Sequence, residues 1–521
     1  MLWLKCGAPM FSLKKIGVCS LFTMCAAFAA DKTTASAIEL LSAPGTTRDT
    51  ETTLIWSKPE KGGADQEFEI TRDGQVIAAT RKTYFTVAGL KTSTHYRFQV
   101  SVRSTGGPVA VSNVLEISTA ATGRRFDIVQ FGAVGDGKTK ATKAIQAAID
   151  ACTVGGTVVV PRGDFLTGAL FLKSDMTLLL EEGAILRGSP AVEDYEPKFL
   201  NRFEGWELET FASLINAGRM DHRGPANVHH LSIRGKGTIM GGGGALGKRM
   251  MDAAGFRSRG RLILLMNCED VEIEGVTLTE PPAWTLHYVY SKNVTIRDVK
   301  IKTVGVRNGD GIDPDSSVNS YIFNTTFETG DDCIAIKSGK NPEGNIVGRP
   351  TENVRIFDCA FVSGHGISIG SEMSGGVRNV LVEDCVAGAL LHGFQVKATR
   401  DRGGVVEKIT VRNCELRKIT VYTELPYNND GKPAPTLPSF RNLRFQDIDL
   451  TNAEAGPVII VNGYSDRAHR TRDVSFERIK FGAGAVVKID QAENVVFKDI
   501  SSTSGVEPKF EITRSENVRR P

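Results

Sequence analysis

The chain has 521 residues, which is too long for one ordinary hydrophobic core, so two domains or a repeat array are expected. Aromatic residues make up only 7% of it and glycine occurs 54 times, a composition that favours many tight turns over a helix bundle. The 63 basic and 60 acidic residues nearly balance, which argues against nucleic acids and membrane surfaces as partners.

The first 29 residues have the pattern of a secretory signal. Lys14 and Lys15 precede an apolar run over residues 16–29, and Ala27-Phe28-Ala29 fits a small-residue cleavage site. The run is shorter than the ~20 apolar residues that cross a bilayer, and no later segment reaches that length. Residues 1–29 contain three lysines and no acidic residue, so the mature chain would be formally neutral. We therefore expect an exported protein, either periplasmic or secreted.

Residues 37–120 are expected to form a small β-sandwich. Apolar and polar residues alternate over residues 96–102, as in a half-buried strand, and Asp73-Gly74 is a hairpin turn signal. With Trp56 on an earlier strand, the segment resembles a fibronectin type III module. It carries no candidate catalytic cluster, so we expect a spacer or docking unit.

From about residue 125 to residue 515 the chain repeats one strand-like pattern. The central apolar residue of this pattern recurs every 21 to 34 residues, a period typical of a solenoid. One strand signature per unit fits an all-β, right-handed parallel β-helix, whereas a propeller blade needs about four strands in ~40 residues. An amphipathic helix over residues 140–152 would cap the open end of the coil. The central residues are Ile273, Ile296, Ile322, Ile356, Val382, Val411, Phe445, Phe476 and Phe497.

Six cysteines lie beyond the signal segment. Cys359, Cys385 and Cys414 share one position of the repeat, which predicts buried free thiols instead of disulfides. The sequence has no C-x-x-C and no clustered Cys/His pattern of a zinc site. We therefore expect no metal and no cofactor.

Four short segments share one register and carry the polar residues of a candidate active site. Each lies between strand-like stretches, and successive strands of a coil stack about 4.8 Å apart. The carboxyl groups in these segments would then crowd together, so at least one pKa is expected to rise and make a general acid, while its neighbours stay charged as bases. The residues expected to converge are Asp310, Asp331, Asp332, His365 and Lys397.

Three further residues lie near this register. Lys337 falls in the same column as Lys397, two rungs away, and is expected to face a ligand. Asp313 and Asp315 are expected to be turn residues, because isolated aspartates at such turns usually only cap backbone groups. The adjacent pair Asp331-Asp332 is different, since two neighbouring carboxylates repel each other without stabilising a turn.

These segments, taken in order, resemble the four motifs of glycoside hydrolase family 28, the polygalacturonases. The resemblance covers about residues 125–500, and the module ahead of the coil is similar to that of bacterial exo-poly-α-D-galacturonosidases. It implies inverting hydrolysis of α-1,4 links between galacturonates in an acidic polysaccharide. The matching segments are Asn308-Gly309-Asp310, Gly330-Asp331-Asp332, Gly364-His365-Gly366 and Val396-Lys397.

The resemblance also implies a role for each residue of the site. Asp331 would be the general acid, while Asp310 and Asp332 would position and deprotonate the attacking water. His365 would tune the acid or relay a proton, and Lys397 would bind a substrate carboxylate.

One position departs from the family pattern. The residue two before Lys397 is normally arginine, and here it is Gln395, which can donate hydrogen bonds but brings no charge. Arg400 or Arg402 could supply the missing charge. A tyrosine of the next rung is expected to line the same subsite, and the candidates are Tyr422 and Tyr427.

Three other functions fit a parallel β-helix. A pectate lyase would depend on calcium and a basic catalytic residue, and the acid pair beside His365 favours hydrolysis instead. A non-catalytic polysaccharide-binding coil, with the module as its stalk, would bind without producing new reducing ends. A rhamnogalacturonan hydrolase is disfavoured by His365 and its flanking glycines.

Long intervals between repeats bear on the mode of attack. Residues 340–350 and 426–438 must leave the coil as loops, and residues 199–209 and 220–225 could add a wall beside the site. Such walls close one end of a groove, and together with the resemblance to exo-poly-α-D-galacturonosidases they lead us to expect exo cleavage from the non-reducing end that releases mono- or digalacturonate. Lys340, Arg349 and Lys432 would hold the acidic chain end. Endo cleavage is the alternative.

Overall fold

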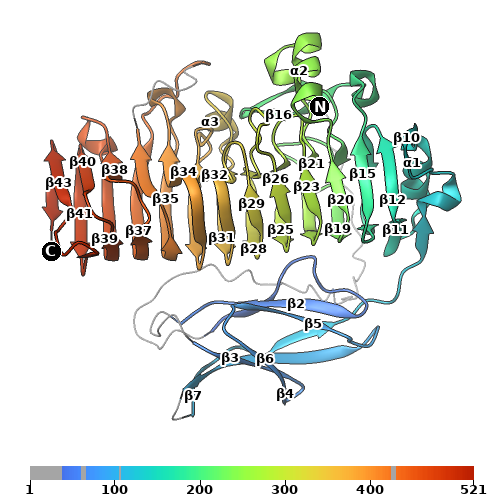
Figure 1. The fold of residues 1–521 in the computed structure, drawn as a ribbon, viewed down its shortest axis with the longest axis horizontal. Helices are drawn as coiled ribbons and strands as arrows, with labels where there is room; N and C mark the ends of the chain where they lie inside the picture. The colour runs from blue at the N-terminus through green and yellow to red at the C-terminus, as the bar shows by residue number, and fades with distance from the viewer. Residues whose placement is uncertain (1–37, 60–65, 105–106, 424–429, 521) are drawn as a thin grey trace, which may run out of the picture.

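The computed structural model describes residues 38–59, 66–104, 107–423 and 430–520. It shows a long coil of stacked strands with a small β module against one side (Figure 1). The predicted signal segment and Tyr427 lie outside the described residues. Within the described part, none of the helices has both the length and the apolar character needed to cross a membrane.

One long face of the coil is a parallel sheet of 15 strands. The central apolar residues of the predicted repeat pair with one another along this sheet, from Ile273 opposite Ile296 to Phe476 opposite Phe497, so the predicted register is confirmed. The strands are β9 (Arg125–Asp127), β11 (Gly156–Val160), β14 (Met176–Leu180), β19 (Val228–Gly235), β22 (Cys268–Glu274), β25 (Lys292–Arg297), β28 (Val318–Phe323), β31 (Thr351–Phe357), β33 (Val377–Glu383), β35 (Val405–Glu415), β37 (Ser439–Leu450), β39 (Thr471–Phe481), β41 (Ala492–Lys498), β42 (Ser501–Ser502) and β44 (Glu516–Arg519).

The remaining faces belong to a parallel sheet of 19 strands. In the first part of the coil this sheet is two separate columns of short strands, and both columns end on β32, which pairs with β29 and with β30. The strands are β10 (Asp136–Lys140), β12 (Gly163–Thr167), β13 (Leu170–Leu172), β15 (Ala184–Gly188), β18 (Ile215–Ala217), β20 (Thr238–Met240), β21 (Ile263–Met266), β23 (Thr277–Thr279), β24 (Leu286–Val289), β26 (Lys300–Lys302), β27 (Ile312–Asp315), β29 (Thr326–Glu328), β30 (Ile334–Ile336), β32 (Ala360–Ile369), β34 (Val386–Lys397), β36 (Lys418–Tyr422), β38 (Gly456–Asn462), β40 (Ala485–Asp490) and β43 (Lys509–Thr513).

The coil is right-handed and encloses one continuous apolar core, which extends from Phe126 to Phe497. Near its C-terminal end the core contains a stack of phenylalanine rings, with Phe445 and Phe476 at 5.0 Å and Phe476 and Phe497 at 4.6 Å. All six cysteines of the described chain are buried and free, which confirms the prediction for the three in the repeat.

Amide side chains stack at one corner of the coil. Asn319 donates to Asn293, Asn353 to Asn319 and Asn379 to Asn353, over 2.6 to 2.9 Å. Each of these residues has a positive φ, a conformation that asparagine tolerates better than most side chains. The stacked amides therefore hold successive turns in register at a corner where the backbone needs such a residue.

Three α-helices lie among the described residues. Helix α1 (Thr142–Ala151) packs Ile145, Ala148 and Ile149 into the end of the core, which confirms the predicted cap. The other two are α2 (Gly243–Ala254) and α3 (Glu343–Val347). Both lie in excursions, by which we mean segments that loop out of the coil between its strands. Short 3-10 helices occur at Ile128–Phe131, Val192–Tyr195, Phe256–Ser258, Arg400–Arg402 and Arg467–His469.

The N-terminal module has two antiparallel sheets around a core of its own. Trp56 and Phe68 face each other across it, with ring centroids 5.5 Å apart. Asp73 and Gly74 form the predicted hairpin turn, and both have positive φ. The strands are β1 (Leu40–Ser42), β2 (Glu51–Trp56), β5 (Tyr84–Ala88), β3 (Phe68–Arg72), β4 (Gln75–Thr80), β6 (His95–Ser104), β7 (Gly107–Val111) and β8 (Leu115–Ser118).

The module is docked on the 15-stranded face (Figure 1). Ala43 and Ile55 of the module pack with Phe323 and Phe357 of the coil in a separate apolar cluster. Ion pairs surround this cluster, including Arg234 with Glu51 at 2.5 Å and Lys58 with Asp384 at 2.6 Å. The module therefore contacts the coil face that does not carry the candidate site.

Candidate active site

The register of four neighbouring strands creates the site. Ile312, Ile334, Ile367 and Phe394 point into the core on β27, β30, β32 and β34 and pair in sequence along one column. The residues two positions before them therefore lie in a second column beside it. Those residues are Asp310, Asp332, His365 and His392.

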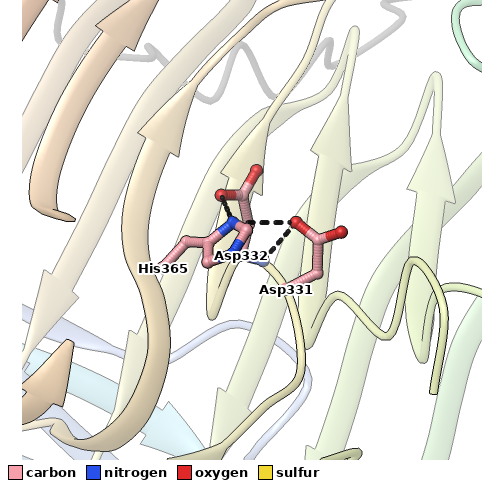
Figure 2. A group of neighbouring side chains, drawn as sticks. All are labelled: Asp331, Asp332 and His365. Atoms are coloured by element: carbon pink, nitrogen blue, oxygen red, sulfur yellow. Dashed lines mark hydrogen bonds and ion pairs between the residues drawn. The ribbon is translucent and has the colours of Figure 1, made fainter. Parts of the chain in front are cut away.

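His365 lies between two carboxylates at the centre of this column (Figure 2). Its Nδ1 is 3.1 Å from Asp331 Oδ1 and 3.6 Å from Asp332 Oδ1. Hydrogen bonds to Asp331, and then to Asp332, raise the pKa of His365 to about 9. The ring therefore holds its proton at neutral pH and shares it with the acid pair.

Asp332 is the buried member of the pair. Lys397 Nζ lies 2.9 Å from its Oδ2, and the Ser368 hydroxyl donates to its Oδ1 over 2.6 Å. Burial alone would raise the pKa of Asp332, but the charge of Lys397 and the hydrogen bond from His365 together lower it below its usual range. Asp332 is therefore held as a carboxylate, as a base requires.

The pKa values of two other carboxyl groups are shifted upward. Burial, with the charges of Asp313 and Asp331, raises the pKa of Asp310 well above its usual range. Burial also raises the pKa of Asp313 to about 7, although Lys337 opposes the shift. In both cases burial is the largest cause, and the negative charge of a neighbouring carboxylate adds to the rise.

Lys337 contacts several acidic side chains of the site. Its ammonium lies 3.3 Å from Glu372, 3.5 Å from Asp313 and 3.7 Å from Asp310, and 4.5 Å from the Trp284 ring centroid. It is almost fully buried, yet it lines a small polar pocket at the site. Lys337 thus reaches the site with its charge shared among three carboxylates.

The expectation that Asp313 and Asp315 are turn residues is wrong. Both lie on β27 and are fully buried. Asp315 is 2.8 Å from Arg202 Nη1 and 3.4 Å from His287 Nε2. The Asp315 side chain is covered because the excursion that carries Arg202 folds back over this rung, and a local turn pattern contains no information about that contact.

Two pockets adjoin the catalytic column. The larger has a volume of about 310 Å³, and the smaller, about 30 Å³. They share Asp331, Ser371 and Lys397, which therefore mark the boundary between them. The larger pocket is also lined by His365, His392, Gln395, Ala398 and Tyr422, and the smaller by Glu204, Trp284, Asn308, Asp310, Asp332, Lys337, Gly370 and Glu372.

The predicted binding residues divide into two groups. Gln395 and Tyr422 line the larger pocket, and Gln395 donates to Ser368 Oγ over 2.7 Å and to Asp332 Oδ1 over 3.4 Å. Arg400 is exposed and lies over the Tyr464 ring, outside the lining of both pockets. Arg402 is fully buried and donates to the Ser371 carbonyl and to Asn341, so the prediction that it contacts substrate is wrong.

A wall of side chains from outside the coil stands beside the smaller pocket. The hairpin of β16 (Phe199–Phe203) and β17 (Trp206–Thr210) carries Glu204 into the pocket lining. Arg257 holds Glu204 at 2.8 Å and also pairs with Asp430. The Trp206 indole donates to the Asn341 carbonyl over 3.0 Å and lies against Lys340 and Arg257.

Two of the three cations expected to hold the chain end have other partners. Lys340 is fully buried and pairs with Asp430, and Arg349 lies over the Tyr290 ring and donates to the His222 carbonyl. The expectation that Lys340 binds substrate is therefore wrong. These side chains fix the wall because segments distant in sequence meet there.

The acid pair and His365 also carry atoms of the kind that can bind a metal ion. One ligand atom each from Asp331, Asp332 and His365 lies within 4.8 Å of the others. Lys397 and the protonated His365 already supply two positive charges to the two carboxylates. The donor set is thus balanced in charge by the protein itself, and we assign no ion to it.

Comparison with known proteins decides the family. The model of glycosyl hydrolases family 28 matches residues 202–518, more than half of the chain. The chain belongs to this family. The resemblance to the polygalacturonases is confirmed, and the protein is a glycoside hydrolase.

Relatives of this family 28 enzyme include both exo- and endo-acting proteins. The exo-poly-alpha-D-galacturonosidase of Dickeya chrysanthemi is 28% identical over 87% of this chain and 88% of its own length. An endo-polygalacturonase of Pectobacterium carotovorum is also 28% identical, over 69% of this chain and 87% of its own length. The solved family 28 exopolygalacturonase of Yersinia enterocolitica superposes with a TM-score of 0.85 at 25% identity, covering 93% of this chain and all of its own.

Sequence reasoning about this family 28 enzyme missed His392. It adds a fourth polar side chain to the column, and the signal was present, since His392-Gly393-Phe394 repeats the pattern of His365-Gly366-Ile367 one rung later. Trp284 could have been found by the same offset, since it precedes Leu286, which pairs with Ile312. Glu204 had no such signal, because it reaches the site from an excursion.

Proposed function

We propose that this enzyme hydrolyses α-1,4-galacturonosidic bonds of polygalacturonate from the non-reducing end, with inversion, and releases galacturonate or its dimer. The observation that carries the proposal is the column of Asp310, Asp332 and His365 beside Asp331 and Lys397, set between an accessible pocket and a walled one. Glycosidic hydrolysis needs a general acid and a general base, and an acid pair with a shared proton beside a fixed carboxylate can supply both.

The geometry suggests how the groups divide the work. The pair of His365 and Asp331 holds the proton for the leaving oxygen, with Asp331 as the donor because it is the more exposed carboxyl. Asp332, kept ionised by Lys397, accepts a proton from the attacking water. Asp310, whose pKa is raised by burial and by the charges of Asp313 and Asp331, orients that water by hydrogen bonding.

The wall supports exo attack. An endo enzyme needs a groove that is open on both sides of the cleaved bond, whereas Glu204 and Trp284 close the side of the smaller pocket. The excursion that carries Glu204 is held in place by the contacts of Arg257, Asp430 and Trp206, so this wall is a fixed part of the fold. The names of the Dickeya and Yersinia relatives favour the same mode.

The mode of attack is tested by viscosity and products together. Polygalacturonate should lose viscosity slowly relative to new reducing ends, and galacturonate or its dimer should be present from the first minutes. A steep fall in viscosity at low conversion, with mid-sized oligomers first, would establish endo attack. New absorbance of an unsaturated uronate would instead identify a lyase, and binding without new reducing ends would identify a non-catalytic coil.

We also propose that the enzyme is exported and that residues 1–29 are its signal. Two features support this: the signal pattern of those residues and the acidic polysaccharide substrate, which is found outside cells that build pectin. Residues 37–120 are proposed as a fibronectin type III-like module and residues 125–515 as the catalytic coil. Detection of the mature N-terminus in an exported fraction tests the signal.

A further inference from the structure

The larger pocket lies on the leaving-group side of the cleaved bond. This step rests on the proposed exo function. Asp331 and Lys397 stand at the boundary of the two pockets, and the smaller pocket is the one that Glu204 closes. The chain end must enter the closed side, so the sugar that leaves occupies the pocket of about 310 Å³.

The charged donors of this pocket already have partners. Lys397 lies 2.9 Å from Asp332, and His365 lies 3.1 Å from Asp331. Gln395 stands where the family has arginine, and its amide is bonded to Ser368 and Asp332. Among the described residues of the lining, none therefore offers an unshared positive charge to a carboxylate.

His392 is the residue of the pocket lining that still has a ring nitrogen available for hydrogen bonding. Two residues of β34, Leu391 and His392, lie opposite the single His365 of β32, and this bulge leaves Leu391 exposed on the outside while His392 lines the pocket. The two histidine rings meet edge to face at 5.6 Å. The His392 Nδ1 is buried and has no hydrogen-bond partner among the described residues.

The surroundings of His392 keep it neutral. Burial, and then the positive charges of His365 and Lys397, lower the pKa of His392 to about 4, although Asp332 opposes the shift. Lys418 on the next strand adds to the positive field but is not part of the lining. A neutral imidazole both donates and accepts one hydrogen bond, which suits sugar hydroxyls better than a carboxylate.

We propose that the leaving-group pocket is built for an uncharged sugar, with His392 and Tyr422 binding its hydroxyls, so that the enzyme cleaves ahead of a methyl-esterified galacturonate as readily as ahead of a free one. His392 is accordingly a specificity-determining residue for the leaving sugar.

The test compares two trimers. One is trigalacturonate, and the other carries a methyl ester on its reducing-end residue only. Whether the enzyme releases monomers or dimers, the bond to that residue must be cut with the residue in the leaving-group pocket. The measured quantity is the apparent kcat/KM for release of the reducing-end residue. For the native enzyme the two values should agree within about threefold, whereas a tenfold preference for the free acid would overturn the proposal.

Variants at position 392 separate binding from folding. His392→Lys should shift the preference about tenfold toward the free acid, because it adds the missing charge. His392→Ala should raise KM for both trimers several-fold with little change in kcat, and His392→Gln should restore much of the loss. Leu391→Ala, in the same bulge but outside the pocket, should change neither value. Unchanged KM in a folded His392→Ala protein would overturn the role of His392.

The trimers also distinguish a failure of the inference about the leaving-group pocket from a failure of the proposed exo cleavage. If the free acid is cut and the ester is not, the inference about the leaving-group pocket fails while exo cleavage stands. If neither trimer is cut but polygalacturonate loses viscosity rapidly, the exo assignment fails and the inference fails with it.

Discussion

At the scale of single residues, the site depends on how two positive charges, on Lys397 and His365, are placed against two adjacent carboxylates. Asp331 and Asp332 are neighbours in sequence, yet Asp332 is buried beside Lys397 while Asp331 is partly exposed beside His365. The same residue type is therefore prepared for two roles.

Removal of the proton donor tests the role of Asp331. Asp331→Asn keeps the shape and the hydrogen bond from the Asp332 backbone but cannot deliver a proton. General acid catalysis contributes on the order of 10²–10⁴-fold, so we expect kcat to fall by at least that factor. Initial rates on polygalacturonate measure it, and an unchanged thermal unfolding curve shows that the fold is kept. Near-normal turnover would disprove the assignment.

Lys397 should control the ionisation of Asp332 as well as bind substrate. The folded-state pKa of Asp332 is depressed, so this base is ionised above that pKa and is lost as pH falls through it. Without the ammonium the pKa of Asp332 rises, so the acidic limb of kcat/KM against pH moves to higher pH in Lys397→Met. A charged hydrogen bond of roughly 1.5–3 kcal/mol is also lost, so kcat/KM should fall tenfold or more.

Lys397→Arg is the matched control because it retains the charge. It should keep the acidic limb near its native position, even where the shape of the guanidinium reduces the rate. An acidic limb that stays in place in Lys397→Met would show that Lys397 does not set the ionisation of Asp332.

At the scale of elements, the wall beside the site is made by excursions that leave the coil and meet again over it. The hairpin of β16 and β17 joins the segment around α3 through Trp206, which bonds to Asn341 and lies against Lys340. The coil supplies the rungs, and the excursions supply the closed end. The proposed exo attack thus depends on elements that are absent from the repeat itself.

Loosening the wall should therefore shift the mode of attack. Trp206→Ala removes the hydrogen bond to Asn341 and the ring contacts with Lys340 and Arg257, none of which involves the catalytic column. We expect viscosity to fall several-fold more per bond cut than with the native enzyme, because internal segments can then cross the site. Trp206→Phe keeps the ring and should behave much like the native enzyme. A product profile identical to the native one in the alanine variant would contradict the wall argument.

At the scale of the whole molecule, the module packs against one face of the coil. Ile55 points away from the module core and packs with Phe323 and Phe357, while its neighbours Leu54 and Trp56 point into that core. Around it, Arg355 donates to the Trp56 carbonyl over 2.9 Å and Tyr84 donates to Asp358 over 2.7 Å. The contact covers strands β28 and β31, behind the rungs that carry the site.

A charge placed in this contact should detach the module without touching catalysis. Ile55→Asp buries a carboxylate against two phenylalanines, a change that costs several kcal/mol. We expect the first thermal transition to fall by about 5 °C or more while kcat at 25 °C stays within twofold. Ile55→Val, which keeps the contact apolar, is the control. A loss of activity that parallels the loss of stability would show that the module also shapes the site.

The sequence by itself predicted the coil and the convergence of Asp310, Asp331, Asp332, His365 and Lys397, although its spacing placed Asp331 opposite His365 where the structure has Asp332. In a parallel coil each rung pairs residue by residue with the next, so a shared offset from an in-register apolar residue is enough to stack Asp310, Asp332 and His365. The same offset would have found His392. Side-chain direction along a strand is a local property, which is why a one-dimensional pattern could predict it.

Only the tertiary structure decided what lies around that column. The burial of Asp315 depends on Arg202, more than a hundred residues away, and Lys340 is unavailable to substrate because Asp430 reaches it from another excursion. The docking of the module and the burial of Arg402 are of the same kind. Excursions have no repeat to fix their register, so their contacts follow from packing in three dimensions, and these contacts set which charges remain free to meet a substrate.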